Sequence, residues 1–258
     1  MSSQKFQNIV LATDLDGTFL TKDPDGRRRN LEAIAYFKEN GGHFTFATGR
    51  AHFNVVGEDY FVIEELLNLP AAVGNGSVLY DYATETPVWK ANTPRELLLD
   101  LYAEMKRCSP SAVLTPKWED PLGEPDTWRE GDFYKLDIRD PEGDLAALID
   151  TLSKYFGERL VFTRAAENCF DVQAIVYTKA MALRKLCELY FDRPVTLCVA
   201  GDYHNDLAMM READLAFCPE NAVDEIKAIS HATLCHHGEG LMADIVKELE
   251  RMIDEGAL

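Results

Sequence analysis

The chain has 258 residues, of which 47% are hydrophobic and 27% are charged, and its formal net charge is -18. This composition excludes a disordered chain and leaves room for a full hydrophobic core and two domains. The negative charge argues against nucleic acid as a partner, so any phosphate site must be made locally positive by a metal, a few basic side chains or helix N-termini.

The cysteines and the amino terminus predict where the protein works. The six cysteines form no C-x-x-C pair, and most have apolar neighbours, as in Leu197-Cys198-Val199. They are therefore expected to be reduced thiols in a cytoplasmic protein. A short polar lead passes directly into Ile9-Val10-Leu11. We therefore expect no signal peptide, no membrane span and no obligate protein partner.

The first predicted strand, from Ile9, ends in two acids, Asp14 and Asp16, followed by Gly17. Ligands bind at the carboxyl ends of strands in open α/β sheets, and the alternation of side chains predicts both carboxylates on the same side. Such close anions repel each other unless a cation such as Mg²⁺ binds their oxygens. One carboxylate could then attack phosphorus while the other transfers a proton. A solvated Asp-rich turn explains the motif equally well when it is taken alone.

The next segment predicts a helix through Leu31–Lys38 and a second strand at His43–Ala47. The arginines at 27–29 are interpreted as a solvated loop and helix start, with screening of an acidic site as the alternative. Thr48-Gly49-Arg50 follows the strand directly. The Thr48 hydroxyl and the free amides of a helix predicted at Phe53–Asn68 can hold phosphate oxygens. A structural turn is the simpler interpretation of this tripeptide alone.

From about Tyr82 the pattern predicts an inserted α+β domain over residues 82–176. Amphipathic helices are expected near Arg95–Arg107 and Leu145–Phe156, and a loop at Pro116–Pro125. Short strands are expected between them, at Val88–Lys90, Ser111–Leu114, Phe133–Ile138, Leu160–Phe162 and Phe170–Val172.

The alternating pattern returns with a helix predicted at Ala180–Tyr190, capped by Thr178 and preceded by Lys179. A buried strand, Val195–Ala200, then ends at Gly201-Asp202. Shorter elements complete the chain around Leu215–Phe217, Val223–Ala228 and Leu241–Met252. Residues 1–81 and 177–258 are therefore expected to form a Rossmann-like α/β domain with a parallel sheet. Its active edge would collect Asp14, Thr48, Lys179 and Asp202, although singly Lys179 could be an exposed lysine and Asp202 a helix cap.

Four ordered motifs resemble those of the haloacid dehalogenase-like (HAD) hydrolase superfamily. D-x-D-G-T matches residues 14–18, the Ser or Thr after a strand matches Thr48, the lysine matches Lys179, and G-D-x-x-N-D matches residues 201–206. The insert between the second and third motifs resembles the Cof-type branch with its type IIB cap domain. Members of that branch are mostly phosphatases of sugar phosphates and similar metabolites. Gly74-Asn75-Gly76-Ser77 departs from the branch, which often has an acid before the Asn.

The resemblance implies a role for each matched residue. Asp14 would be the nucleophile and Asp16 the general acid and base. Mg²⁺ would be held by Asp14, Asp202 and the backbone carbonyl of Asp16. Asp206 would support Lys179 or the metal shell. The phosphoryl-binding groups would be the Leu15 backbone, Thr48, Gly49, Lys179 and Asn205.

The expected function is a Mg²⁺-dependent phosphatase that hydrolyses a small phosphorylated metabolite, such as a sugar phosphate, through an aspartyl-phosphate. A sugar phosphomutase with the same intermediate is an alternative. A non-catalytic phosphometabolite-binding protein is another, although the intact nucleophile argues against it. Substrate choice is expected from cap residues, among them Trp118, Trp128, Tyr134, Lys135, Arg164 and Asn168. His204 is interpreted as a surface residue, with substrate contact as the alternative.

Overall fold

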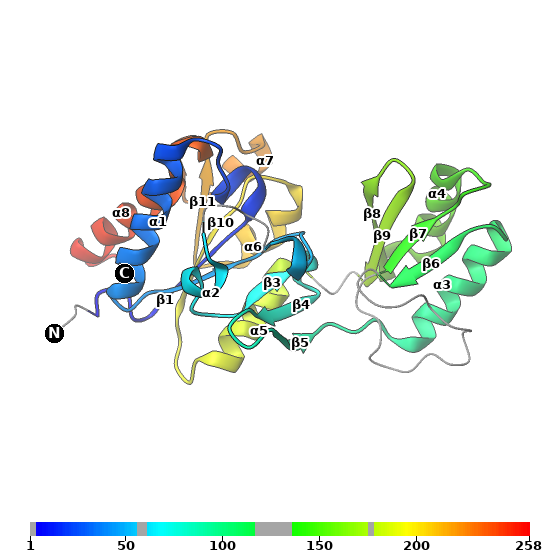
Figure 1. The fold of residues 1–258 in the computed structure, drawn as a ribbon, viewed down its shortest axis with the longest axis horizontal. Coiled ribbons are helices and arrows are strands. Elements are labelled where there is room, and N and C mark those ends of the chain that lie inside the picture. The colour runs from blue at the N-terminus through cyan, green and yellow to red at the C-terminus, as the bar shows by residue number, and fades with distance from the viewer. Residues whose placement is uncertain (1–3, 56–60, 117–135, 175–177) are drawn as a thin grey trace. The chain divides into compact units, whose positions relative to one another are not determined.

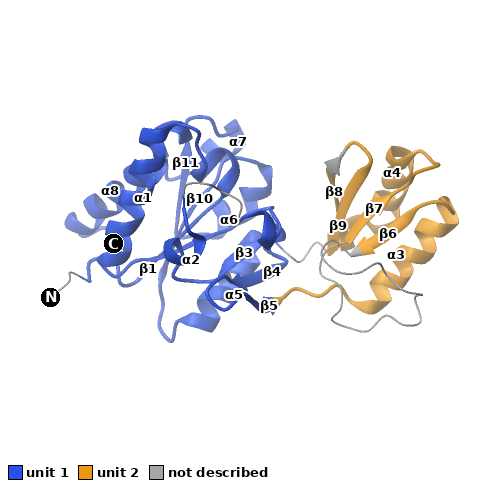
Figure 2. Ribbon diagram, viewed as in Figure 1, with its two compact units in different colours: residues 1–89, 178–258 blue, residues 90–177 orange. Residues whose placement is uncertain are grey.

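The computed structural model describes residues 4–55, 61–116, 136–174 and 178–258. The chain divides into two compact units (Figures 1 and 2). Residues 1–89 and 178–258 form one, here called the core unit, and residues 90–177 form the other, here called the inserted unit. The first boundary lies at Trp89 instead of residue 81. The reason is that β5 (Thr86–Lys90) joins β3 (Ala71–Val73) and β4 (Val78–Asp81) in one sheet of the core unit.

Five parallel strands of the described chain make the main sheet of the core unit, in the order β12-β11-β10-β1-β2. The strands are β1 (Ile9–Thr13), β2 (His43–Phe46), β10 (Thr196–Ala200), β11 (Leu215–Pro219) and β12 (Ala232–Leu234). Thr13 pairs with both Ala200 and Phe46, so the carboxyl ends of β10, β1 and β2 meet at one edge. Ala47 then bridges to Ala72 of β3, which brings the smaller sheet to the same edge. The parallel α/β fold class is confirmed.

Helices pack on both faces of the main sheet (Figure 1). On one face, Val10 and Ala12 of β1 share a buried cluster with α5 (Lys179–Tyr190) and α6 (Leu207–Glu212). Each large side chain in such a cluster contributes about 1.5–3 kcal/mol of burial energy. Elsewhere α1 (Pro24–Glu39) and α8 (Leu241–Asp254) pack together. The buried Asn30 side chain joins them, because it donates to the Phe19 carbonyl and accepts from the Met242 amide.

Two predicted helices differ from the structure. α1 begins at Pro24, where Asp23 accepts a hydrogen bond from the Gly26 amide at 2.8 Å, so the three arginines lie inside the helix and not in a loop before it. The helix predicted at Phe53–Asn68 is wrong: its described residues form a 3-10 turn at His52–Asn54 and the short α2 (Ile63–Leu66). The Lys38 ammonium binds the carbonyl of Leu66 at 2.9 Å, so a side chain of α1 satisfies a carbonyl at the end of α2.

The inserted unit is an antiparallel sheet with two helices, as the α+β pattern predicts. Its strands, in the order β6-β7-β9-β8, are β6 (Val113–Pro116), β7 (Leu136–Arg139), β9 (Cys169–Ala174) and β8 (Leu160–Ala166). α3 (Arg95–Cys108) and α4 (Leu145–Phe156) bury apolar side chains against Leu136, Ile138 and Val172. The remaining short helix, α7 (Asp224–Lys227), belongs to the core unit. Within the described ranges, no helix has the length and apolar character that crossing a bilayer requires.

Candidate active site

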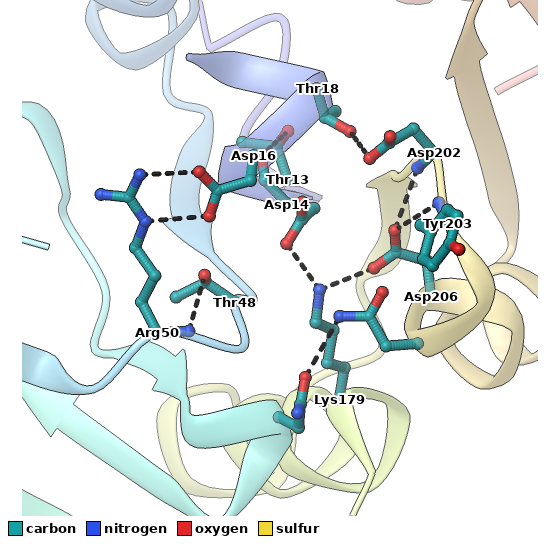
Figure 3. Close-up of polar contacts among 12 residues, drawn as sticks. Thr13, Asp14, Asp16, Thr18, Thr48, Arg50, Lys179, Asp202, Tyr203 and Asp206 are labelled. Carbon is teal, nitrogen blue, oxygen red and sulfur yellow. Dashed lines mark hydrogen bonds and ion pairs between the residues drawn. The ribbon is translucent and has the colours of Figure 1, made fainter. Parts of the chain in front are cut away.

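Asp14 occupies the carboxyl end of β1, at the centre of the sheet edge. Its amide donates to the carbonyl of Ala200 at 2.8 Å, which extends the pairing with β10 by one residue. The chain then turns sharply through Leu15–Phe19, where Gly17 has φ +80°. Asp14 is only 5% exposed, and its carboxylate points toward Lys179 (Figure 3).

Lys179 joins two buried carboxylates. Its ammonium lies 2.6 Å from Asp14 Oδ1 and 2.6 Å from Asp206 Oδ1, and the side chain is fully buried at the start of α5. The Thr178 side chain caps this helix, as predicted, by accepting from the Met181 amide at 3.2 Å. Burial by itself lowers the pKa of Lys179, but attraction to Asp14 and Asp206 outweighs it and raises the pKa above its ordinary value. The ammonium is therefore charged at neutral pH.

Asp206 holds Lys179 and the loop after β10 together. Its Oδ2 accepts from the amides of Asp202 at 2.9 Å and Tyr203 at 3.1 Å, while Oδ1 accepts from Lys179. A side chain at Gly201 would place its Cβ 2.6 Å from the Asp206 Cβ and Cγ atoms, so only glycine fits. Both oxygens of Asp206 are thus used within the protein.

Asp14, Asp202 and Asp206 offer carboxylate oxygens that lie within 4.8 Å of one another. Burial raises the pKa of Asp14, against the opposing effect of Lys179, and burial also raises that of Asp202. Asp202 Oδ1 accepts from the Thr18 hydroxyl at 2.8 Å. The other oxygens of Asp14 and Asp202 accept no hydrogen bond from the described residues, unlike those of Asp206. The neighbouring carboxylates of Asp14 and Asp202 repel each other when both are ionised. A hard divalent cation would relieve this repulsion, and the oxygen donors fit Mg²⁺.

Asp16 has a different environment from Asp14 although only Leu15 separates them. Its carboxylate accepts from Arg50 Nε at 2.9 Å and from Nη2 at 2.6 Å, and its side chain is 61% exposed (Figure 3). Asp14 and Asp16 both line one cavity, described below, but regular strand geometry ends at Thr13 and the two side chains take separate partners. Leu15 itself is fully buried.

The loops after β2 and β3 complete this edge. The Thr48 hydroxyl is buried and accepts from the Arg50 amide at 3.1 Å. Asn75 lies beside Gly49, and its Oδ1 accepts from Asn205 Nδ2 at 3.2 Å. A cavity of about 370 Å³, here called the nucleophile cavity, opens between these groups. It is lined by Asp14, Asp16, Gly49, Arg50, Asp202, Tyr203 and Asn205.

Comparison with known proteins identifies the family. The model of the haloacid dehalogenase-like hydrolases matches residues 11–114 and 122–243. The chain belongs to this family. A phosphoglycolate phosphatase of Thermoplasma acidophilum is 26% identical over 86% of this chain and 89% of its own length. An HMP-PP phosphatase of Yersinia enterocolitica is 24% identical over 84% and 86%. A HAD/COF-like hydrolase structure from Plasmodium vivax has a TM-score of 0.70 at 20% identity and 96% coverage of both chains.

This HAD-like hydrolase is therefore a phosphoric monoester hydrolase by family. Its structure adds two residues near the site to which the motifs assign no role, Arg50 and Asn75. Arg50 follows the second motif directly, so its position in Thr48-Gly49-Arg50 was a usable signal. Asn75 has φ +58° between two glycines, and the Gly74-Asn75-Gly76 pattern indicated an unusual turn but not its contact with Asn205.

The remaining candidates are the six residues of the predicted cap and His204. Trp118, Trp128, Tyr134 and Lys135 fall outside the described residues. Arg164 on β8 and Asn168 in the following turn are exposed in the inserted unit. His204 is also exposed and packs its ring near that of Tyr203, with 4.7 Å between centroids. These positions stay predictions.

Proposed function

We propose that this HAD-like hydrolase is a Mg²⁺-dependent phosphatase that hydrolyses a small phosphorylated metabolite, such as a sugar phosphate, through a covalent aspartyl-phosphate. The observation that carries the proposal is the buried Asp14 carboxylate, held by Lys179 at the floor of an acidic, oxygen-rich cavity. The two curated relatives described above are named for small phosphorylated substrates, phosphoglycolate and HMP-PP, which supports this substrate class.

Asp14 is assigned the nucleophilic step. One of its oxygens forms a bond to phosphorus as the bond between phosphorus and the leaving oxygen breaks. The contact with Lys179 holds the carboxylate in place, and the same ammonium neutralises charge on the phosphoryl oxygens. Asp14, Asp202 and the backbone carbonyl of Asp16 are the groups that would hold Mg²⁺, which when bound supplies further positive charge to the phosphoryl group.

Asp16 is assigned the proton transfers. It gives a proton to the leaving oxygen in the first step and takes one from the water that cleaves the aspartyl-phosphate in the second. In the structure both Asp16 oxygens accept from Arg50, and we expect at least one of these hydrogen bonds to open when Asp16 carries a proton. The exposed position of the pair makes that opening inexpensive.

The other groups are assigned to the phosphoryl oxygens. Thr48, Gly49, Asn205 and the Leu15 backbone would bind the transferred group at the edge of the sheet. Asp206 is a positioning residue, since it touches Lys179 and the loop amides and offers no free oxygen.

Replacement of the nucleophile tests the mechanism. Asp14→Asn keeps the shape of the side chain but removes its nucleophilic charge. We expect hydrolysis of p-nitrophenyl phosphate in Mg²⁺ to fall by about 10³-fold or more. Asp25→Asn, at an exposed acid in the first turn of α1, is the matched control and should keep full activity. Circular dichroism and thermal unfolding verify that both variants fold.

Three outcomes would contradict parts of this proposal. Near-normal turnover by Asp14→Asn would exclude Asp14 as the nucleophile. Activity that survives exhaustive chelation would remove the metal. Isomerised sugar phosphate without free phosphate as the product would identify a phosphomutase.

A further inference from the structure

The turn between β3 and β4, here called the Gly74–Gly76 turn, touches three of the four motifs. Its Asn75 amide donates to the carbonyl of Thr48, the second motif, at 2.9 Å. The turn packs against the start of α5, which carries Lys179 of the third motif. The Asn75 side chain contacts Asn205 of the fourth motif. The motifs themselves give this turn no role.

The backbone of the turn would accept glycine at all three positions. Gly74, Asn75 and Gly76 have φ of +59°, +58° and +90°, a region that glycine enters without strain. Asn enters it more easily than other residues with a side chain, but it gains no backbone advantage over glycine. The presence of a side chain at Asn75 is therefore explained by what that side chain contacts.

Asn75 contacts the carboxamide of Asn205. Asn75 Oδ1 accepts from Asn205 Nδ2 at 3.2 Å, with both amides assigned in the orientation that makes this bond. Asn205 lines the nucleophile cavity. Its Nδ2 atom carries a second N–H, which donates to none of the described residues. One donor of Asn205 is thus held by Asn75, and the other is left for a ligand.

The backbone of Asn205 is fixed independently of Asn75. Asn205 lies in the 3-10 turn His204–Asp206, whose last residue binds Lys179 at 2.6 Å. The Asn205 side chain is exposed, so without Asn75 it would sample several rotamers. Ordering such a side chain when a ligand binds costs about two- to tenfold in affinity. A contact that orders it beforehand avoids this cost.

We propose that Asn75 is a positioning residue that holds the Asn205 carboxamide so that its second N–H points at an oxygen of the transferred phosphoryl group. This inference rests on the proposed phosphatase function, in which Asn205 binds that group. Asn75 acts through Asn205 alone, since it does not itself line the nucleophile cavity.

A double-variant cycle separates this role from a merely structural one. Asn75→Gly removes the side chain at a position where glycine fits the backbone. Asn205→Ala removes the amide that Asn75 would orient. The probe is orthovanadate, an analogue of phosphate, and its affinity for each variant is measured by isothermal titration calorimetry in Mg²⁺. Kinetics with p-nitrophenyl phosphate give kcat/KM for the same variants.

We expect Asn75→Gly to weaken orthovanadate binding and to lower kcat/KM about fivefold. Asn205→Ala should lower both about tenfold or more, since hydrogen bonds to charged groups are the strong ones. In the Asn205→Ala background, Asn75→Gly should change either quantity by less than about twofold. Thermal unfolding should stay close to that of the wild type, because the hydrogen bond that is lost is exposed.

Glu85→Gly is the matched control. Glu85 also has positive φ, +54°, and is exposed in the turn between β4 and β5. The substitution therefore removes a side chain from the same kind of backbone position without touching Asn205. It should keep wild-type affinity for orthovanadate and wild-type turnover.

The possible failures are distinguishable. A loss from Asn75→Gly that is equally large in the Asn205→Ala background would show that Asn75 acts independently of Asn205, and would overturn the inference. Wild-type affinity in Asn75→Gly or in Asn205→Ala, or an equal loss in Glu85→Gly, also overturns it. If the wild-type protein binds orthovanadate but hydrolyses no phosphoester, the proposed function fails, while the binding cycle still decides the role of Asn75.

Discussion

The buried and exposed halves of the site contain ion pairs of the same length with different physical consequences. Lys179 lies 2.6 Å from Asp14 and Asp206, with all three side chains nearly or fully buried. Arg50 lies equally close to Asp16, where the two side chains are 27% and 61% exposed. Water screens the second pair but not the first, so distance alone does not measure the strength of either. In the proposed mechanism, the buried half would hold the nucleophile still, whereas the exposed half would let the proton carrier move.

Removal of the buried cation should have the largest effect. Lys179→Met leaves two buried carboxylates without a partner, and we expect a loss of about 3–5 kcal/mol in the free energy of unfolding. Activity should fall by about 10²-fold or more. Urea unfolding and steady-state kinetics measure the two effects. The loss of stability in Lys179→Met should shrink as pH is lowered. The reason is that the buried Asp14 carboxyl, whose pKa is raised, binds a proton more readily in the folded state than in the unfolded state.

The matched control for this variant lies on the same helix. Lys185 is exposed and pairs with Glu188 at 3.1 Å, so Lys185→Met should change stability by less than about 1 kcal/mol. Equal losses from the two lysine variants would remove the distinction between buried and exposed pairs.

An intermediate effect is expected at Gly17, between the two halves. A Cβ at Gly17 would collide with the Asp202 carboxylate, and φ of +80° disfavours any side chain. Gly17→Ala should therefore cost about 2–3 kcal/mol and displace Asp202, which lowers both stability and activity. Gly256→Ala is the control, since Gly256 also has positive φ, +71°, but nothing lies within 4 Å of its added Cβ.

The difference between these two glycine variants isolates the contact with Asp202 from backbone strain. Gly256→Ala should cost only about 1 kcal/mol and leave turnover unchanged. If Gly17→Ala has the same small cost and full activity, the Asp202 position does not depend on the close approach of the Gly17 backbone.

The smallest effect should come from the exposed pair. Arg50→Met should change the free energy of unfolding by no more than about 1 kcal/mol, because solvent screens the charge it removes. Arg184→Met, which breaks an exposed pair with Glu212 at 2.9 Å, should match it in urea unfolding. A loss from Arg50→Met as large as that from Lys179→Met would show that the exposed half is also a rigid part of the fold.

Much of the site was predictable because parallel strands end at one edge. The pairing of Thr13 with both Ala200 and Phe46 brings residues far apart in the chain together there. The resemblance of the motifs implied that Asp206 supports either Lys179 or the metal shell, and the structure shows its contact with Lys179. The division of Asp14 and Asp16 between separate partners was not predictable, since it depends on where regular strand geometry stops and on an Arg50 side chain from another loop.

The sequence by itself determined the parallel core, the α+β insert and the order of four motifs, because strand and helix periodicity and local capping are encoded by neighbouring residues. Only the tertiary structure decided the unit boundary at Trp89, the short helix in place of a long one at 53–68, and the Asp16–Arg50 ion pair. The Asp16–Arg50 pair joins segments distant in the chain, and the unit boundary depends on the pairing of β5 with β4 in a sheet of the core unit; local periodicity carries no record of such contacts.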